Sequence, residues 1–328
     1  MGSLSAAATM RLLITGAGGF LGQALASALM EDAAVSKIIL TDVLEPSIPS
    51  SMRDSVCEVQ ALKADLTDKN ALERLFTSDL THVYLLHGIM SGAAEAHLEL
   101  GLSVNVDSMR LIMDILRRVK PAIPVIFPSS LAVFGPMAEG SVVTESTMPL
   151  PQSSYGAQKQ ICEVLLNDFS RRGLLDARIV RLPTIIVRPG KPTGAASSFC
   201  SAIFREPLNG EKSILPVPRD LKLWVCSTRT IVRNLWIARD VPTEKFKEGS
   251  RIINLPGRTV TVQQMLDALN EVSGEETVSL VDEAPDKNVA RIVGSWPAHF
   301  DTTWARSLGF REDGSLSQTI RHYLEDYA

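Results

Sequence analysis

The sequence has little cysteine and histidine, and what it has is scattered. Its four cysteines, Cys57, Cys162, Cys200 and Cys226, lie far apart and form no CxxC pair. Such spacing favours reduced thiols in a protein core over a disulfide framework or a zinc site. The five histidines form no HxxxH or HExxH pair. Because the common helical metal signatures need those pairs, we expect no metal site.

The sequence also lacks an excess of positive charge and a long apolar run. It carries 33 Lys and Arg against 37 Asp and Glu, a net charge of −4, and without a basic stripe we expect no nucleic-acid partner. Its apolar runs are far shorter than the roughly 20 residues that span a bilayer, so we expect no membrane partner. The N-terminus has no basic region before a long apolar stretch, which favours a cytoplasmic protein with a disordered extension over residues 1–9.

The first half of the chain alternates short β-branched runs with helical patterns. The runs predict strands at 11–16, 37–42, 82–88, 124–130 and 177–186. Helical spacing predicts helices at 22–32, 68–79, 104–120 and 155–173. Strands that alternate with helices form right-handed βαβ units around a parallel sheet. The predicted fold class is therefore α/β, a Rossmann doubly wound parallel sheet with a smaller C-terminal substrate domain.

After residue 184 the pattern changes, because Pro and Gly become common and the elements become shorter. One clear helix is expected at 259–274, with Thr261 as a candidate N-cap. We assign residues 10–183 to the Rossmann domain and 184–328 to the smaller substrate-binding part. The apolar stretch 222–241 is expected to return to the core of the first domain.

A glycine-rich segment, TGAGGFLG, lies between the first strand and the first helix. Gly16, Gly19 and Gly22 are spaced as GxxGxxG, and the next predicted strand ends in Asp42. Glycines let the backbone approach a pyrophosphate at the helix N-terminus, and an acid at the end of the second strand binds the ribose hydroxyls of NAD. Glycines also serve purely structural turns, but this placement favours a dinucleotide site, and Asp42 favours NAD over NADP.

Two further segments follow predicted strands. Asp65-Leu66 comes where a third strand would end, near the expected adenine position; the alternative is a helix cap, which Thr67 or Asp68 could supply. Ser129 and Ser130 follow the strand 124–130 directly. Ligands bind at the carboxyl ends of strands in open α/β sheets, although two serines there can also cap a turn.

Tyr155 and Lys159 stand one helical turn apart at the start of a predicted helix. Such a pair alone could be an ordinary helix start. A free tyrosine has a pKa of about 10, and a nearby cation favours its phenolate. Together with Ser130, which could bond a substrate oxygen on which charge develops, the pair would form an acid/base site.

These motifs, in this order, resemble the extended short-chain dehydrogenase/reductase family, whose members are also described as NAD-dependent epimerases/dehydratases. GxxGxxG, Asp42, Asp65-Leu66, Asn105, SSLAVFG and YxxxK carry the resemblance, which runs from about residue 10 to the C-terminus. It implies that Ser130, Tyr155 and Lys159 are catalytic and that NAD is the cofactor. The implied cofactor residues are Gly16, Ala17, Gly19, Phe20, Leu21, Gly22, Asp42, Asp65, Leu66, Leu86, His87, Gly88, Asn105, Tyr155, Lys159, Pro183, Thr184 and Ile185.

The substrate region departs from the sugar-nucleotide pattern of many members. Thr184 stands where Asn is usual after RLP, Phe134 replaces the Tyr of VYG, and LWVCSTRTIV lacks the usual paired acids. Segments such as REPLNG and VGSWPAHFD resemble a subgroup, the D-erythronate dehydrogenases. That likeness implies oxidation of the C2 hydroxyl of a four-carbon sugar acid to the 2-oxo acid. The expected substrate residues are Ser91, Gly92, Ser130, Arg188, Ser197, Ser198, Trp224 and Arg233.

Several alternatives stay open from sequence. Arg188 could cap or pair at the surface, Trp224 could be plain core, and Arg233 could sit on an exposed helix face. The enzyme could instead be a reductase or epimerase of another hydroxy or keto compound. A non-catalytic NAD-binding protein is disfavoured, because Ser130, Tyr155 and Lys159 are all present. The family resemblance also leads us to expect a homodimer, formed through the helices at 104–120 and 155–172.

Overall fold

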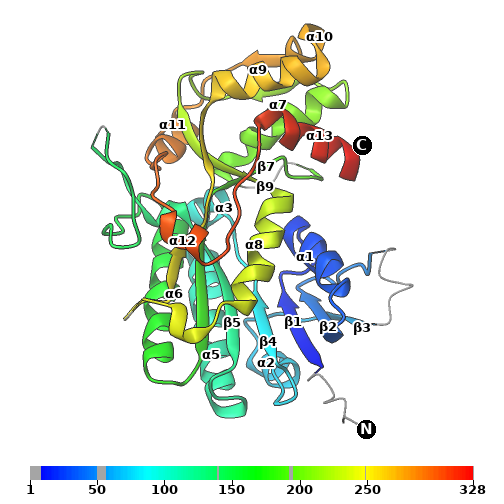
Figure 1. The fold of residues 1–328 in the computed structure, drawn as a ribbon, viewed down its shortest axis with the longest axis vertical. Helices are drawn as coiled ribbons and strands as arrows, with labels where there is room; N and C mark the ends of the chain where they lie inside the picture. Colours follow the sequence, from blue (N-terminus) through cyan, green and yellow to red (C-terminus); the bar gives the residue numbers. More distant parts are fainter. Residues whose placement is uncertain (1–8, 50–56, 139, 192–194, 248, 328) are drawn as a thin grey trace.

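The computed structural model describes residues 9–49, 57–138, 140–191, 195–247 and 249–327. The extension expected over 1–9 lies outside these residues, apart from Thr9. Figure 1 shows a large sheet flanked by helices, with a smaller group of elements beyond one end of the sheet. That group includes α7 (Phe199–Leu208), α9 (Val262–Ser273) and α10 (Glu275–Val278). Among the described residues, no helix is both long and apolar enough to cross a membrane.

The central sheet has seven parallel strands in the order β10-β6-β5-β4-β1-β2-β3. This confirms the predicted Rossmann architecture. The order reverses beside β1, and in such sheets ligands bind at that point, outside the carboxyl ends of the strands. The strands span β1 Met10–Thr15, β2 Val35–Asp42, β3 Glu58–Lys63, β4 His82–Leu85, β5 Pro124–Ser130, β6 Asp176–Leu182 and β10 Ile252–Asn254.

Helices cover both faces of this sheet, because its strands are apolar on both sides. Leu12 and Leu13 of β1 point to opposite faces and are both fully buried. Leu12 belongs to a cluster with α1 and α8, and Leu13 to a cluster with α2, α5 and α6. The helices span α1 Phe20–Met30, α2 Lys69–Leu75, α3 Ser91–Ala96, α4 Leu98–Leu102, α5 Ser108–Val119, α6 Ser154–Arg171 and α8 Thr228–Asp240.

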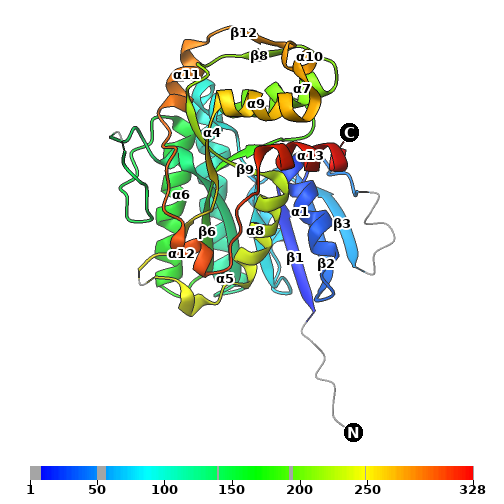
Figure 2. The same cartoon turned by 45° about the horizontal axis from the view of Figure 1, so that its top comes forward.

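The C-terminal part has its own apolar cluster and two small sheets. Figure 2 shows β8 and β12 with α7, α9 and α10 above the main sheet. Its strands are β7 Thr184–Ile186, β8 Ser213–Leu215, β9 Lys222–Ser227, β11 Arg258–Thr261 and β12 Val281–Glu283. Its helices are α7 Phe199–Leu208, α9 Val262–Ser273, α10 Glu275–Val278, α11 Lys287–Gly294 and α13 Leu316–Tyr327. One further helix, α12 Thr303–Ser307, packs Ala305 into the cluster that holds α1 and α8.

The stretch 222–241 is divided between the two parts. Its first half forms β9, which pairs with β7 and β11 and buries Leu223 and Val225 in the C-terminal cluster. Its second half forms α8, whose Ile231 and Leu235 pack against the large sheet. The chain therefore crosses between the two parts within a few residues.

Most predicted elements have slightly different bounds in the structure. Three of them need a comment. The strand expected at 177–186 is two strands, β6 and β7, because Pro183 lacks the N–H that a continuous strand needs. The helix expected at 104–120 starts with a π-helical turn, Ser103–Asp107, before α5. The helix around Thr261 is confirmed as α9, where Thr261 and Gln264 form a capping box.

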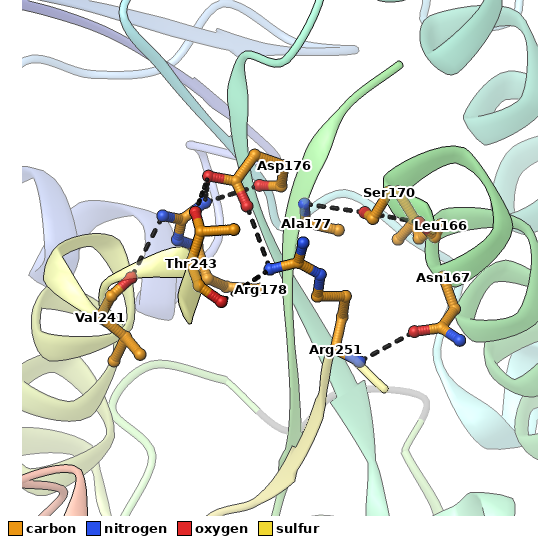
Figure 3. A network of polar contacts seen from close by, with 9 residues as sticks. All are labelled: Leu166, Asn167, Ser170, Asp176, Ala177, Arg178, Val241, Thr243 and Arg251. Atoms are coloured by element: carbon orange, nitrogen blue, oxygen red, sulfur yellow. Dashed lines mark hydrogen bonds and ion pairs between the residues drawn. The ribbon is translucent and has the colours of Figure 1, made fainter. Parts of the chain in front are cut away.

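A polar network ties β6 to the segment after α8 (Figure 3). The Asp176 carboxylate pairs with Arg178 at 2.5 Å and with Arg251 at 3.4 Å, and it accepts a hydrogen bond from Thr243 Oγ1 at 2.8 Å. These groups lie at the amino end of β6, far along the strand from its carboxyl end. The network therefore stabilises the fold at the edge of the sheet opposite the carboxyl ends of the strands, where ligands are expected to bind.

We expect Asp176→Asn to lower the free energy of unfolding by about 2–3 kcal/mol, since it strands the buried Arg178 guanidinium. Urea denaturation measures this change. The matched control is Asp168→Asn on α6, whose pairs with Arg171 and Arg172 are exposed and should contribute less than about 1 kcal/mol. Equal losses in the two variants would contradict this account of the network.

Candidate active site

A cavity of about 960 Å³ lies at the carboxyl ends of the central strands. Parallel strands end at the same edge, so the loops after β1 to β6 meet there. One end of the cavity is lined by the glycine-rich loop and the other by the segment after β7. Its lining includes Gly16, Gly18, Gly19, Phe20, Leu21, Gly22, Asp42, Asp65, Leu66, Leu86, His87, Gly88, Ser91, Ser129, Ser130, Tyr155, Lys159, Pro183, Thr184, Ile185, Arg188, Lys191, Ser197 and Trp296.

The glycine-rich loop joins β1 to α1. Gly16 has φ +65°, and a Cβ there would lie 2.6 Å from the backbone nitrogen of His87, so only glycine fits. Gly19 is the N-cap of α1 and offers no side-chain cap. The first N–H groups of α1 are therefore available to an anion in the cavity.

Two acids mark the same end of the cavity. Asp42 ends β2, and its carboxylate accepts hydrogen bonds from the backbone nitrogens of Gly18 at 3.0 Å and Val43 at 2.7 Å. Asp65 accepts bonds from the backbone and hydroxyl of Thr67, and the hydroxyl bond is the main cause that lowers the pKa of Asp65. The cap of α2 is instead Asp68, which accepts from the Asn70 nitrogen.

His87 lines the cavity and is held between two hydroxyls. Its Nδ1 lies 2.8 Å from Thr15 Oγ1, and its Nε2 lies 3.0 Å from Ser108 Oγ. Burial, followed by the charge of Lys159, lowers the pKa of His87 to about 3. The imidazole therefore stays neutral at physiological pH, with both ring nitrogens engaged, and is unsuited to be a general base.

Ser130 and Tyr155 are brought together by close packing of α6 on β5. Gly156 makes this possible, because a Cβ there would lie 2.1 Å from the carbonyl oxygen of Ala132. The N-terminus of α6 is fixed by Ser153, whose Oγ accepts from the Gly156 nitrogen, and by Glu95, which accepts from the Ser154 nitrogen. As a result, Ser130 and Tyr155 are hydrogen-bonded through their side chains.

The Tyr155 hydroxyl is protonated in the protein without a cofactor. Burial raises the pKa of Tyr155 to about 12, while the bond with Ser130 and the charge of Arg188 oppose that rise. A general base needs a pKa near the working pH. Tyr155 can serve as one only if further positive charge arrives beside it, as a bound oxidised nicotinamide would provide.

Lys159 is buried one turn after Tyr155. Its Nζ donates to the carbonyl oxygen of Pro128 at 2.9 Å and lies 4.4 Å from the centre of the Phe127 ring. Burial lowers the pKa of Lys159 to about 8, although the charges of Cys162 and Glu163 act to raise it. Keeping a cation here costs stability, which is typical of functional rather than structural lysines.

We expect Lys159→Met to raise the melting temperature by about 2–4 °C at pH 7. The folded-state pKa is about 8, below the ordinary lysine value of 10.5, so burying the charged lysine opposes folding at pH 7. That penalty declines as pH rises from 8 towards 10.5 and is gone above it, because the unfolded chain then also loses the proton. Thermal melts of both proteins across this range measure the difference. A lower melting temperature for the variant at pH 7 would contradict the account.

The other end of the cavity carries cations and an aromatic side chain. Arg188 is 9% exposed, and its Nη2 donates to the carbonyl oxygen of Ser197 at 2.7 Å. Ser91 accepts a hydrogen bond from the backbone nitrogen of Ala196, which joins α3 to the same segment. Lys191 and Trp296 also line this end. Within the lining, the acids Asp42 and Asp65 both belong to the glycine-loop end.

Most residues nominated from sequence meet at this cavity, but six do not line it. Ala17 belongs to the glycine-rich loop itself and is fully buried. Asn105 is buried too, and its side chain bonds Ile89 and Gln158. The remaining four, which were expected to bind substrate, are Gly92, Ser198, Trp224 and Arg233.

Two of these expected substrate residues have other partners. Trp224 stacks on Phe300, with ring centroids 5.1 Å apart. Arg233 is exposed on α8 and lies over the Trp236 ring. Trp224 is therefore a core residue and Arg233 lies on an exposed helix face, which are the two alternatives that the sequence left open.

Sequence reasoning missed Lys191 and Trp296 at the substrate end. Lys191 stands three residues after Arg188 in a Pro/Gly-rich segment with no periodicity. Trp296 follows α11, more than a hundred residues from the catalytic motif. A charge near Arg188 was a signal for Lys191, but Trp296 reaches the cavity only through the packing of the C-terminal part.

Comparison with known proteins shows to which family a chain with this site is similar. A model of the NAD dependent epimerase/dehydratase family matches residues 12–241. The chain is 40% identical to a D-erythronate dehydrogenase of Haemophilus influenzae over 96% of its own length and 99% of that protein. It is also 40% identical to a D-erythronate dehydrogenase of Cupriavidus necator, over 97% of this chain and 98% of the relative.

Solved structures are similar over the same length. A protein of Agrobacterium tumefaciens described as a nucleoside-diphosphate-sugar epimerase has a TM-score of 0.89 and 36% identity, covering 97% of this chain and 94% of its own. A GalE-like L-threonine dehydrogenase from Cupriavidus necator has a TM-score of 0.82 and 25% identity, covering 96% and 99%. The likeness therefore includes the C-terminal part as well as the sheet.

Proposed function

Because the chain belongs to the NAD-dependent epimerase/dehydratase family, we propose that it oxidises the C2 hydroxyl of a small sugar acid such as D-erythronate to the 2-oxo acid. It is an NAD-dependent oxidoreductase that acts on a CH–OH group. The sugar acid, the oxidised carbon and the roles of individual residues are the proposed steps.

The cavity fits NAD along its length. The open N-terminus of α1 would hold the pyrophosphate, and Asp42 would bind the adenosine ribose. The fit has a structural sign at Gly16, where the loop approaches the backbone of Leu86 and His87, just after β4, so closely that no side chain is tolerated. Lys159 would hold the nicotinamide ribose, and the backbone of Pro183–Ile185 would meet the carboxamide.

The reaction assigns one task to each catalytic side chain. NAD supplies the hydride acceptor. Tyr155 takes the proton from the C2 hydroxyl while the C2–H bond breaks, so that the C–O bond becomes a carbonyl. Ser130 bonds the same oxygen and orients it, and Lys159 favours the phenolate of Tyr155 by its positive charge.

The observation that carries the substrate class is the charge at the far end of the cavity. Arg188 and Lys191 line it, whereas the acids of the described lining lie at the cofactor end. An arginine fork pairs with a carboxylate through two charge-assisted hydrogen bonds. An anionic substrate is therefore favoured over a neutral polyol, and also over a cationic group that would need an acid.

Two other activities are named among the relatives, an epimerase and L-threonine dehydrogenases. An epimerase returns its cofactor to the starting state after each turnover, so it gives no net reduced NAD. Threonine carries an ammonium group, and the described lining offers no acid beside Arg188 to receive it. Both alternatives can be tested together with the sugar acid.

The experiment follows the absorbance of reduced nicotinamide with erythronate, threonate, glycerate, L-threonine and the uncharged erythritol. We expect reduction of NAD with a short sugar acid, little with erythritol, and a slower rate when NADP replaces NAD, because Asp42 repels a 2′-phosphate. A rate with erythritol equal to that with erythronate would overturn the carboxylate proposal. Turnover of threonine alone would replace it.

We also propose a homodimer formed through α5 and α6. Ile161 and Val164 on α6 are 42% and 63% exposed, and Val119 at the end of α5 is 37% exposed. Such apolar positions are favourable at an interface between copies. Light scattering should give twice the 35.7 kDa of one chain for the wild type. The Val164→Asp variant should instead give the mass of one chain, because a charge at the interface opposes association. A wild-type mass of one chain at micromolar concentration would contradict the proposal.

A further inference from the structure

The carboxyl end of β5 is bonded to α6 at three consecutive residues. Ser130 bonds Tyr155, the carbonyl oxygen of Pro128 accepts from Lys159 Nζ at 2.9 Å, and Ser129 Oγ donates to Glu163 Oε1 at 2.5 Å. Residues 155, 159 and 163 are spaced one turn apart, so they form a ladder along one face of α6. The first two rungs hold the catalytic pair, and the third has no assigned role.

The third rung belongs to a buried ion pair. Glu163 is 1% exposed and Arg181, on β6, is 3% exposed. Arg181 donates to both carboxylate oxygens of Glu163, through Nε at 2.9 Å and Nη2 at 2.7 Å. The Arg181 guanidinium also lies over the Phe134 ring, 4.7 Å from its centre. Glu163 of α6 is therefore held against two neighbouring strands, through Ser129 of β5 and Arg181 of β6.

An ion pair buried this deeply needs an explanation other than stability. Removing two charges from water costs about as much as their attraction returns, and apolar side chains of similar volume are often as stable. What the pair does provide is a fixed geometry. Ser129 lies between the carbonyl that binds Lys159 and the hydroxyl that binds Tyr155, so the position of Ser129 sets both.

We propose that Ser129, Glu163 and Arg181 form a positioning network that fixes β5 against α6 and so holds Ser130, Tyr155 and Lys159 in register. The proposal rests on the catalytic roles assigned above. None of the three residues needs to touch substrate for this task. A shift of about 1 Å in reacting groups can lower a rate about 10²-fold, so a small movement of β5 is enough to matter.

The network also affects the charge balance around Lys159. The groups that face Lys159 are Tyr155, Cys162 and Glu163 on its own helix and His87 after β4. Cys162 and Glu163 both act to raise the pKa of Lys159, and Glu163 is the member of the network that does so. The hydrogen bond that places Lys159 and the charge of Glu163 thus have the same effect, since both keep the lysine cation next to Tyr155.

The first test compares two buried serines that both tie α6 to a strand. Ser129→Ala removes the third rung but keeps the ion pair. The matched control is Ser170→Ala near the far end of α6, where Ser170 bonds Leu166 and Ala177 (Figure 3). We expect Ser129→Ala to lower kcat about 10-fold and Ser170→Ala to leave it unchanged, with similar losses in melting temperature.

The second test removes the pair without leaving a buried charge. Glu163→Leu combined with Arg181→Met keeps the volume apolar, so the protein should fold with a melting temperature near that of the wild type. We expect kcat to fall about 10²-fold all the same. A wild-type kcat in this folded double variant would overturn the proposal, as would equal losses in Ser129→Ala and Ser170→Ala.

A binding measurement makes the test independent of the substrate. ADP should contact only the adenosine end of the cavity, whereas NAD also needs Lys159. We expect Ser129→Ala to weaken NAD about 3- to 10-fold while ADP binds as to the wild type, and Ser170→Ala to change neither. If no sugar acid is oxidised, the proposed function fails. The ratio of NAD affinity to ADP affinity still tests whether the network positions Lys159. An unchanged ratio in Ser129→Ala would then overturn it.

Discussion

Replacing Tyr155 by Phe should lower kcat for sugar-acid oxidation by about 10³-fold while NAD binds with nearly the wild-type dissociation constant. Phe keeps the ring in α6 but removes the hydroxyl that we propose takes the substrate proton. General base catalysis of this kind contributes about 10²–10⁴-fold. Steady-state assays of NAD reduction give kcat, and a separate titration gives the dissociation constant of NAD.

The matched control is Tyr84→Phe. Tyr84 is fully buried in β4, and its hydroxyl has no hydrogen-bond partner among the described residues. Its removal should leave kcat within about twofold and should not destabilise the fold, since an unpaired buried hydroxyl has nothing to lose. If Tyr155→Phe also stayed within about tenfold of the wild type, another group would have to be the base.

The pH dependence of the wild type follows from the same residue. The pKa of Tyr155 is raised to about 12 by burial in the protein without a cofactor. Positive charge from a bound oxidised nicotinamide would lower that pKa in the complex, because it favours the phenolate. The rate of oxidation should therefore rise with pH through the pKa that Tyr155 has in the complex. Tyr155→Phe should lose that rise.

Replacing Arg188 by Leu should raise the KM for the sugar acid about 10²-fold. Charge-assisted hydrogen bonds to a buried arginine contribute about 1.5–3 kcal/mol, which corresponds to a change of about 10- to 150-fold. Arg188 lines the cavity near Ser197 and its charge acts on Tyr155, so kcat should fall less than KM rises. Saturation curves with erythronate and with uncharged erythritol separate the two effects.

Arg233→Leu is the matched control for this prediction. Both arginines were candidates from sequence, but Arg233 is exposed on α8 and contacts Trp236. It should change neither KM nor kcat. If Arg188→Leu slowed erythritol and erythronate alike, the loss would reflect a disturbed cavity and Arg188 would not be the carboxylate receptor.

The parts of the fold that could be predicted are those with local signals. The parallel sheet followed from short β-branched runs alternating with helical patterns, and α9 followed from the Thr261 cap. The cavity brings together Ser130, Tyr155 and Lys159, which were nominated because they follow a strand or begin a helix. These features depend on neighbours within a few turns, which is the range that sequence patterns report.

The substrate end was harder to predict because it depends on packing between distant segments. Trp224 looked like a pocket residue from its segment, yet Phe300 covers it. Trp296 lacked any local signal but lines the cavity. The pairing of Glu163 with Arg181 likewise joins a helix to a strand, and neither residue shows by itself which partner it will meet.

The most direct test of the central claim is the fate of the hydrogen on C2. Erythronate carrying deuterium at C2 is incubated with the protein and NAD, and the reduced cofactor and the acid product are analysed by mass spectrometry. The account predicts one deuterium in the reduced NAD and a 2-oxo acid that has none. Deuterium that stays in the acid while NAD is reduced would show oxidation at another carbon. An epimerised acid that keeps its deuterium, formed without net NAD reduction, would show an epimerase, and either result would contradict this proposal.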